Sequence, residues 1–187
     1  MEKHASLSFD RYASDERPRI LVVDPSKRNL GVMARRLWEA GYRVTTAERA
    51  EHAIAELHLA HVDLMLAELD IPGTDGAELT RLVRDEIMWR DLPIMLITGR
   101  SELAGTVRAY EAGADDVIVK PFHFEVLFAR IERQLARAQS LRQLRDDNAT
   151  LDARVVQRAI AVGELRDRLH ASEAERRRLE LMVRKSA

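Results

Sequence analysis

The chain contains no cysteine, few aromatic residues and no long apolar run. The absence of cysteine among its 187 residues excludes a disulfide framework and a thiolate metal site. No apolar run approaches the ~18 residues that a membrane-spanning helix needs. Residues 1–18 form a polar leader that lacks the hydrophobic segment of a signal peptide. We therefore expect a cytoplasmic protein with no membrane partner.

An excess of charge of one sign is also missing, since the formal net charge is −1. Residues 137–187 nevertheless carry 12 basic and 8 acidic side chains, which leaves the preceding part acidic. The run Arg176-Arg177-Arg178 is flanked by glutamates, which favours a solvated helical face over a nucleic-acid-binding arm. No helix-turn-helix or zinc-finger pattern is present. We expect no nucleic-acid partner.

Residues 61–76, HVDLMLAELDIPGTDG, are the most informative part of the chain. An apolar run from Val62 to Ala67 predicts a buried strand that ends at Glu68, at the mouth of a tight loop. Asp75-Gly76 predicts a second turn before a helix. The segment therefore delivers a carboxylate to the end of a strand.

Three further apolar runs end in polar residues, and five strand candidates in all alternate with helical stretches. This alternation predicts parallel βαβ units, in which ligands bind beyond the carboxyl ends of the strands. Asp24, Glu68, Thr98 and Lys120 are therefore expected to converge. The further strands are expected at Arg19–Val23, Leu92–Ile97 and Ala114–Val119, and the helices near 27–40, 48–60, 77–89, 102–112 and from 124 onward.

These residues together resemble the receiver domain of two-component response regulators, over residues 19 to about 138. The matching features are the acidic end of the first strand, the D-x-x-M-P-G-x-D-G loop, the strand ending in Thr98 and the Lys120-Pro121 pair, whose proline is commonly cis in the family. The resemblance implies a five-stranded parallel, doubly wound α/β sheet of flavodoxin type with strand order 2-1-3-4-5. It divides the chain into a flexible leader (1–18), a receiver (19–138) and a helix continuous with the last receiver helix (139–187).

The chain departs from the family pattern at three positions. Glu68 stands where the phosphoacceptor aspartate is expected, and its extra methylene shifts the attacking oxygen by roughly 1 Å, which costs about 100-fold where near-attack geometry matters. Pro25 replaces an acidic residue that would coordinate magnesium and supplies no ligand. Val117 replaces the aromatic switch residue. The pattern predicts a pseudo-receiver without the usual phosphorylation, with magnesium binding weak or absent and no other metal; its pocket residues are Asp24, Pro25, Glu68, Asp70, Thr98, Lys120 and Pro121.

Two interpretations of the pocket remain open. In one, Glu68 pairs with Lys120, accepts a hydrogen bond from Thr98 and mimics the activated state. In the other, the pair only neutralises a buried lysine, because an unpaired buried charge is costly. Asp70 is expected to be a turn residue that contributes its backbone carbonyl.

From Phe124 to Arg184 the chain has no proline and one glycine, which predicts a single helix of about 60 residues. Apolar residues recur there at alternating spacings of three and four, as in a coiled coil. Asn148 at an a position, with valines at a and leucines at d, favours a parallel two-stranded homodimer. Arg158, Ser172 and Arg176 weaken this seam, and the open alternative is one amphipathic helix that folds back on the receiver. The predicted seam comprises Leu141, Leu144, Asn148, Leu151, Val155, Val162, Leu165, Leu169, Leu179 and Val183.

These features predict a non-enzymatic adaptor of bacterial signal transduction that contacts a histidine kinase or an output protein. No nucleophile triad, Walker loop or dinucleotide motif is present. Two alternatives stay open: the chain is the regulatory N-terminal portion of a cyclic-dinucleotide enzyme or a histidine kinase, or it is a receiver phosphorylated at a non-standard carboxylate. The upstream kinase, the downstream partner and the pathway cannot be predicted from these residues.

Overall fold

The computed structural model describes residues 17–99 and 103–185, and from residue 164 onward it describes only part of the side chains. The chain forms two compact units that divide after Gln139. The first unit holds all the described strands, and the second is helical. The predicted leader lies outside the described residues up to Glu16.

The first unit is built on a five-stranded parallel sheet in the order β2-β1-β3-β4-β5, which confirms the predicted fold. The central strands β3 and β4 are buried along their whole length, so they are almost continuously apolar, as parallel strands covered on both faces are. The edge strand β2 is partly exposed and includes two threonines. The strands are β1 (Arg19–Val23), β2 (Arg43–Ala47), β3 (Leu64–Glu68), β4 (Ile94–Thr98) and β5 (Asp116–Val119).

Three strands begin two residues later than the apolar runs predicted. Val62 and Leu92 are buried, at 6% and 8% exposure, but each lies in the segment that leads into its strand. Burial against the core therefore extends beyond the hydrogen-bonded ladder, and hydrophobicity alone does not mark where the ladder starts.

Two of the helices, α1 and α3, begin at residues whose side chains accept hydrogen bonds from the first turn of the helix. Ser26 Oγ accepts from the Asn29 backbone N–H at the start of α1, and the Asp75 carboxylate accepts from that of Glu78 at the start of α3. The helix predicted to reach residue 89 ends at Asp85, and turns follow it. The helices are α1 (Lys27–Glu39), α2 (Ala50–Leu59), α3 (Gly76–Asp85), α4 (Leu103–Glu111) and α5 (Phe124–Lys185).

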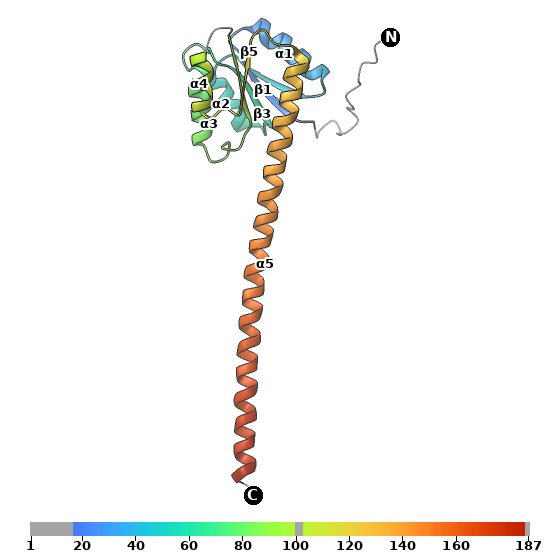
Figure 1. Cartoon of the computed structure of the whole chain (residues 1–187), viewed down its shortest axis with the longest axis vertical. Coiled ribbons are helices and arrows are strands. Elements are labelled where there is room, and N and C mark those ends of the chain that lie inside the picture. The colour runs from blue at the N-terminus through green and yellow to red at the C-terminus, as the bar shows by residue number, and fades with distance from the viewer. Residues whose placement is uncertain (1–16, 100–102, 186–187) are drawn as a thin grey trace, which may run out of the picture. The chain divides into compact units, whose positions relative to one another are not determined.

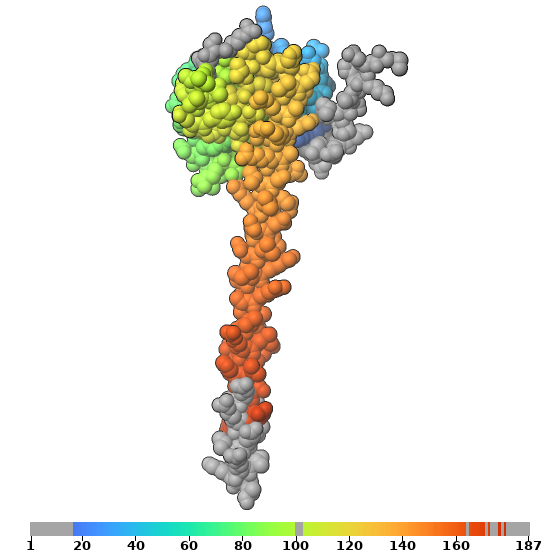
Figure 2. All heavy atoms as spheres, viewed as in Figure 1, coloured from blue at the N-terminus to red at the C-terminus, as the bar shows by residue number. Residues whose placement is uncertain are grey.

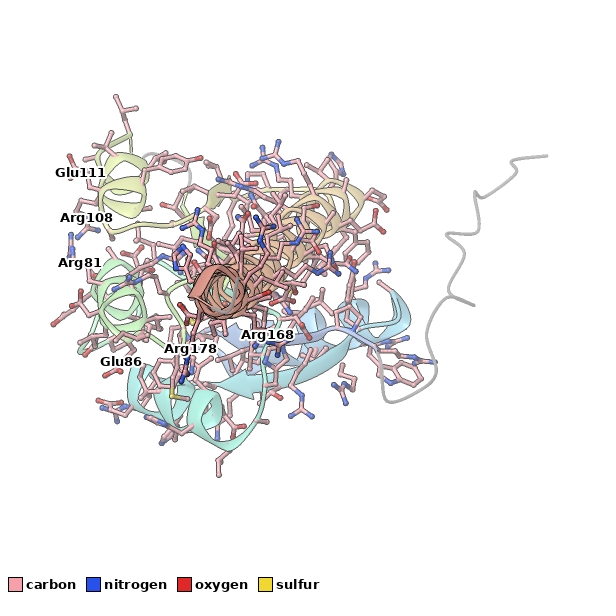
Figure 3. All side chains as sticks on the ribbon, turned by 90° about the horizontal axis from the view of Figure 1, so that it is seen from below. Arg81, Glu86, Arg108, Glu111, Arg168 and Arg178 are labelled. Carbon is pink, nitrogen blue, oxygen red and sulfur yellow. The ribbon has the colours of Figure 1, made fainter. Side chains whose placement is uncertain are left out.

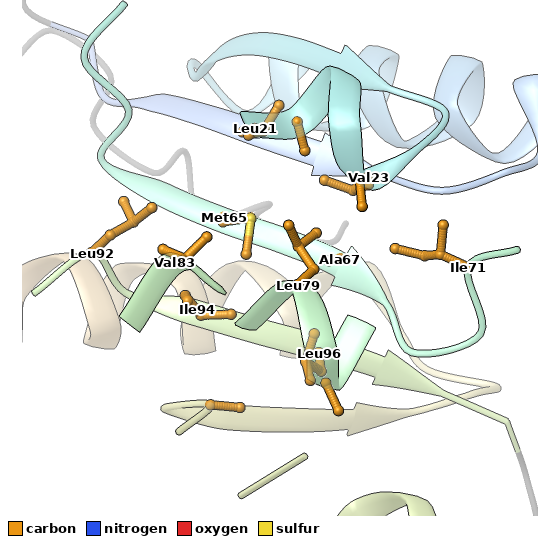
Figure 4. Packing of buried hydrophobic residues seen from close by; sticks show 14 of the residues in the cluster. Leu21, Val23, Met65, Ala67, Ile71, Leu79, Val83, Leu92, Ile94 and Leu96 are labelled. Atoms are coloured by element: carbon orange, nitrogen blue, oxygen red, sulfur yellow. The ribbon is translucent and has the colours of Figure 1, made fainter. Parts of the chain in front are cut away.

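Two hydrophobic clusters cover the two faces of the sheet. Figure 1 shows α2, α3 and α4 on one side of the sheet and α1 with the start of α5 on the other. On the first side, Leu79 and Val83 of α3 pack against Met65, Ile94 and Leu96 of the central strands (Figure 4). On the other side, Leu37, Leu127 and Ile131 are fully buried. The sheet is thus held rigidly between helices, with its strand ends free to carry a site.

The second unit is the continuation of α5, which spans 62 residues without a break and confirms the predicted single helix. Its side chains in residues 140–163 stand open to solvent along the helix (Figure 2). No described helix is both long and apolar enough to cross a membrane. The side chains of the seam residues Leu179 and Val183 are not among those that the structure describes. The exposed apolar seam residues are Leu141, Leu144, Leu151, Val155, Val162, Leu165 and Leu169.

Candidate functional site

Four predicted residues lie at one end of the sheet, where the strands have their carboxyl ends. Asp24 follows β1, Glu68 and Thr98 end β3 and β4, and Lys120 follows β5. The Lys120 backbone N–H donates to the Thr98 carbonyl at 2.8 Å, which continues the β4–β5 ladder into the site. Asp24, Glu68 and Thr98 are all buried. The carboxyl ends of the strands therefore carry buried polar groups in an otherwise apolar sheet.

Glu68 and Lys120 form an ion pair at this end of the sheet, in which Lys120 Nζ donates to Glu68 Oε2. The Glu68 side chain is only 10% exposed, whereas that of Lys120 is 38% exposed. Burial raises the pKa of Glu68 above its usual range, and the charges of Asp24 and Asp70 add to this shift, while the hydrogen bond and charge of Lys120 oppose it. Glu68 is therefore the more deeply buried partner, whereas the interpretation of a neutralised lysine expects Lys120 to be the buried one.

Thr98 lies in the pocket, but the predicted hydrogen bond from its hydroxyl to Glu68 is absent. Its Oγ1 is buried and has no hydrogen-bond partner among the residues that the structure describes. Glu68 carries its carboxylate one carbon further from the strand than aspartate would, and the carboxylate contacts Lys120 instead. The predicted three-residue contact is therefore corrected to a two-residue ion pair.

Asp24 is held by the turn that starts α1. Its Oδ1 accepts from the Ser26 backbone N–H at 2.7 Å, and the Asn29 side-chain amide donates to Oδ1 at 3.3 Å and to Oδ2 at 3.1 Å. Pro25 lies between Asp24 and Ser26, where its fixed φ suits a tight turn and its missing N–H leaves no donor unpaired. The surviving carboxylate of the first strand is thus satisfied by the chain itself.

The loop after β3 is shaped by two glycines. Gly73 has φ +94°, a conformation that side chains with a Cβ rarely adopt. At Gly76 the start of α3 approaches β3 so closely that a Cβ would overlap the Glu68 carbonyl oxygen. The Gly76 N–H donates to the Leu69 carbonyl at 2.7 Å, and Asp70 is exposed. The Asp-Gly motif is therefore needed for the close approach of a helix to the site strand.

The remaining predicted positions lie around β5. The Lys120–Pro121 peptide bond is cis. Val117 is buried at 6% exposure, and its carbonyl accepts from Arg130 Nη1 at 3.0 Å. Tyr110, on α4, is half exposed. The sequence of β5 is DVIV, so this strand contains no aromatic residue that could replace the missing switch residue.

Magnesium is the cation that the resemblance implies, and the residues present do not fit it. Mg²⁺ requires hard oxygen ligands in near-octahedral geometry. Within residues 17–99 and 103–185, no three acidic, histidine or cysteine side chains are grouped as ligands. The Asp24 oxygens already accept hydrogen bonds, Pro25 supplies no ligand and the Glu68 carboxylate meets an ammonium group.

Several charged residues that organise the domain escaped the sequence analysis. The Arg84 guanidinium donates to the carbonyls of Gly113, Arg90 and Leu92 and pairs with Asp115 at 2.7 Å; burial lowers its pKa, and Asp115 partly offsets this. The only sequence signal was an arginine late in an amphipathic helix, which is usually a solvated residue. Its partners are distant in sequence, so spacing could not reveal them.

A second missed ion pair joins α3 to α4 beside the site. Arg108 Nη1 contacts Asp75 Oδ2 at 2.9 Å, so the carboxylate that caps α3 also binds α4. Figure 3 shows Arg108 and Arg81 along the edge that α3 and α4 share. The Asp75 turn was predicted, but its partner on α4 was not.

The chain is similar to known regulators over its first two thirds. The family model described as response regulator receiver domain matches residues 20–132. The transcriptional regulatory protein ResD of Bacillus subtilis is 38% identical over 120 residues, which cover 64% of this chain and 49% of that protein. The phosphate regulon transcriptional regulatory protein PhoB of Rhizobium meliloti is 37% identical over 123 residues, which cover 65% and 54%. The chain thus spans about half the length of these curated relatives.

Solved structures give the same result. A putative response regulator from Chloroflexus aurantiacus superposes with a TM-score of 0.63 at 29% identity and covers 65% of this chain and 99% of that one. The receiver domain of a signal transduction histidine kinase from Syntrophus aciditrophicus superposes with a TM-score of 0.60 at 31% identity and covers 64% and 90%. On its sheet topology, its strand-end residues and these similarities, the chain belongs to the response regulator receiver domain family.

Proposed function

We propose that this receiver is a non-enzymatic adaptor of two-component signalling that acts through protein contacts and is not phosphorylated by the usual magnesium-dependent route. The observation that carries the proposal is the Glu68–Lys120 ion pair, which occupies the position where a phosphorylated aspartate would meet the lysine. The proposed partners are a histidine kinase or an output protein, and the proposed location is the cytoplasm.

The energetics of the pair favour a role in the pocket over a role in stability. Glu68 is the buried partner, and its raised pKa means that Lys120 does not fully offset the cost of burying the charge. A lysine that reaches solvent does not need a carboxylate to neutralise it. A pair that costs free energy of folding is expected where function requires it, so we interpret Glu68 as a fixed substitute for the phosphoryl contact of Lys120.

A phosphodonor assay tests the interpretation that Glu68 replaces the phosphoryl contact. The wild-type chain is incubated with acetyl phosphate and magnesium, and its intact mass is measured; we expect no added phosphate. The double variant Pro25→Asp with Glu68→Asp restores the missing metal ligand and the acceptor aspartate and should gain one phosphate, while Glu68→Asp alone separates the acceptor from the metal ligand. A phosphate on the wild-type chain, through Glu68 or Asp70, would overturn the proposal.

We further propose that the adaptor is a homodimer, with a second copy of α5 as the partner of its apolar seam. The support is the exposure of seven seam residues, between 44% and 65%, on a helix that runs without a break. Such a face is stabilised when an equivalent helix covers it. Asn148 at an a position is exposed in the single chain and would pair with its equivalent in a parallel dimer, which fixes the register.

A second candidate function follows from the length of the relatives. This chain matches only about half the length of the curated regulators. One similar structure is the receiver domain of a histidine kinase. The receiver and helix would then be the regulatory portion of a larger signalling enzyme. An open reading frame that continues past Ala187 into a catalytic domain would establish this second function, and a stop codon there would favour the adaptor.

A further inference from the structure

We propose that the side-chain amide of Asn29 takes the place of a divalent cation at Asp24 and makes the pocket independent of magnesium. The inference rests on the proposed function in one respect, since both hold that the pocket works without a bound cation. It adds a named residue of this chain that occupies the position.

The contacts of Asp24 carry the inference. The carboxylate is buried at 6% exposure, and a buried carboxylate needs donors or a cation to compensate for lost hydration. Asn29 Nδ2 lies 3.3 Å from Oδ1 and 3.1 Å from Oδ2, so one amide group spans both oxygens. The Ser26 backbone N–H adds a contact of 2.7 Å to Oδ1. A cation could bind these oxygens only by displacing the amide.

The start of α1 fixes the amide in this position. The Asn29 backbone N–H donates to Ser26 Oγ at 3.3 Å, so Asn29 lies in the first turn of the helix, directly above the Asp24 turn. Pro25 belongs to the same turn and removes the neighbouring metal ligand. The sequence D-P-S-K-R-N therefore disfavours a cation at this position in two ways, because Pro25 removes a ligand and the Asn29 amide competes for the remaining carboxylate.

A neutral amide differs from a cation in its effect on Glu68. A divalent ion would cancel the negative charge of Asp24, whereas the amide hydrogen bonds leave that charge in place. The Asp24 charge raises the pKa of Glu68, in the opposite direction to Lys120. Among the described residues, Lys120 is the cationic side chain that pairs with Glu68. The pocket thus depends on Lys120, whereas a phosphorylated receiver would depend on magnesium.

Thermal unfolding of the full chain tests the inference. Wild type, Asn29→Ala and Asn29→Asp are melted with a chelator or with millimolar Mg²⁺, at matched ionic strength. We expect no effect of Mg²⁺ on the Tm of wild type. Asn29→Ala should lower the Tm by about 5 °C in both buffers, because a hydrogen bond to a buried charge is lost. Asn29→Asp should melt lower in chelator and regain several degrees with Mg²⁺, because it exchanges a donor for a ligand.

Arg28→Ala is the matched control, because Arg28 is an exposed neighbour on the same turn. Its Tm should stay at the wild-type value in both buffers. The inference fails if Mg²⁺ stabilises wild type, if Asn29→Ala melts like wild type, or if Asn29→Asp shows no recovery with Mg²⁺. The phosphodonor assay is read separately: phosphate on a wild-type chain whose Tm ignores Mg²⁺ would overturn the proposed function and leave the role of Asn29 standing.

Discussion

Lys120 and Glu68 are bound to each other, yet the structure buries only the carboxylate of the pair. Because the pKa of Glu68 is raised above its value in the unfolded chain, the folded state favours the protonated form. The stability that Glu68 contributes is therefore fully present below its unfolded pKa and is lost as the pH rises through its folded pKa. Receivers of this design should be less stable at neutral pH than their packing suggests.

The variant Glu68→Gln tests this pH dependence. It removes the titrating group, so its stability relative to wild type should increase from about pH 4 to about pH 8. Near neutrality, its free energy of unfolding should be at least that of wild type and up to about 1 kcal/mol higher. Urea unfolding across this pH range measures the difference. Parallel stability curves for the two proteins would mean that the Glu68 pKa is not raised.

Lys120→Ala serves as the converse control. It leaves Glu68 buried without its cation, so we expect a loss of about 2 kcal/mol near neutral pH that shrinks in acid, where Glu68 takes up a proton. Lys27→Ala is the matched surface variant, because Lys27 pairs with Glu48 at 3.5 Å in solvent and its side chain is 82% exposed. That change should cost less than about 0.5 kcal/mol.

A charge in the α5 seam should separate the proposed dimer. Leu151 is an exposed leucine at a d position, and Leu151→Glu would place two carboxylates at the centre of a parallel coil. Light scattering should give a dimer mass for wild type and a monomer mass for the variant, with the receiver fold retained in circular dichroism. Gln157→Glu, at an exposed position off the seam, should remain a dimer. A monomeric wild-type chain would contradict the assembly.

Two glycine-to-alanine changes should have opposite effects on stability. Gly76→Ala pushes a methyl group into the Glu68 carbonyl and should cost about 2 kcal/mol or more, because backbone must move. Gly31→Ala lies within α1, meets nothing within 4 Å and should stabilise by about 0.5–1 kcal/mol through helix propensity. Thermal denaturation compares them. Equal and small effects would mean that α3 does not approach β3 as closely as described.

The fold was predictable because its signals are local. The apolar runs before Asp24, Glu68, Thr98 and Lys120 indicated four of the five strands, and the resemblance implied their order. Strand starts were less predictable, since Val62 and Leu92 are buried by packing outside the ladder. Hydrophobicity reports burial, and it does not report which backbone groups pair.

The candidate site was predictable in its members but not in its contacts. Spacing placed Thr98 and Lys120 with Glu68, but which of the two would bind the carboxylate depends on side-chain reach, and Thr98 was assigned a bond that the structure lacks. Asn29 escaped attention because an asparagine in the first turn of a helix usually serves the helix itself. Its bond to Asp24 depends on the turn at residues 24–26, which spacing alone does not reveal.

We expect the Arg84 side chain to limit where this domain can deform. It connects the segments that enter β4 and β5, through the carbonyls of Leu92 and Gly113 and the Asp115 carboxylate, and the same carboxylate accepts the Ile94 backbone N–H. These contacts lie at the ends of the strands opposite to Glu68, where they hold the segments before β4 and β5 together. We therefore expect a change in the pocket to be relayed through the loops after the strands.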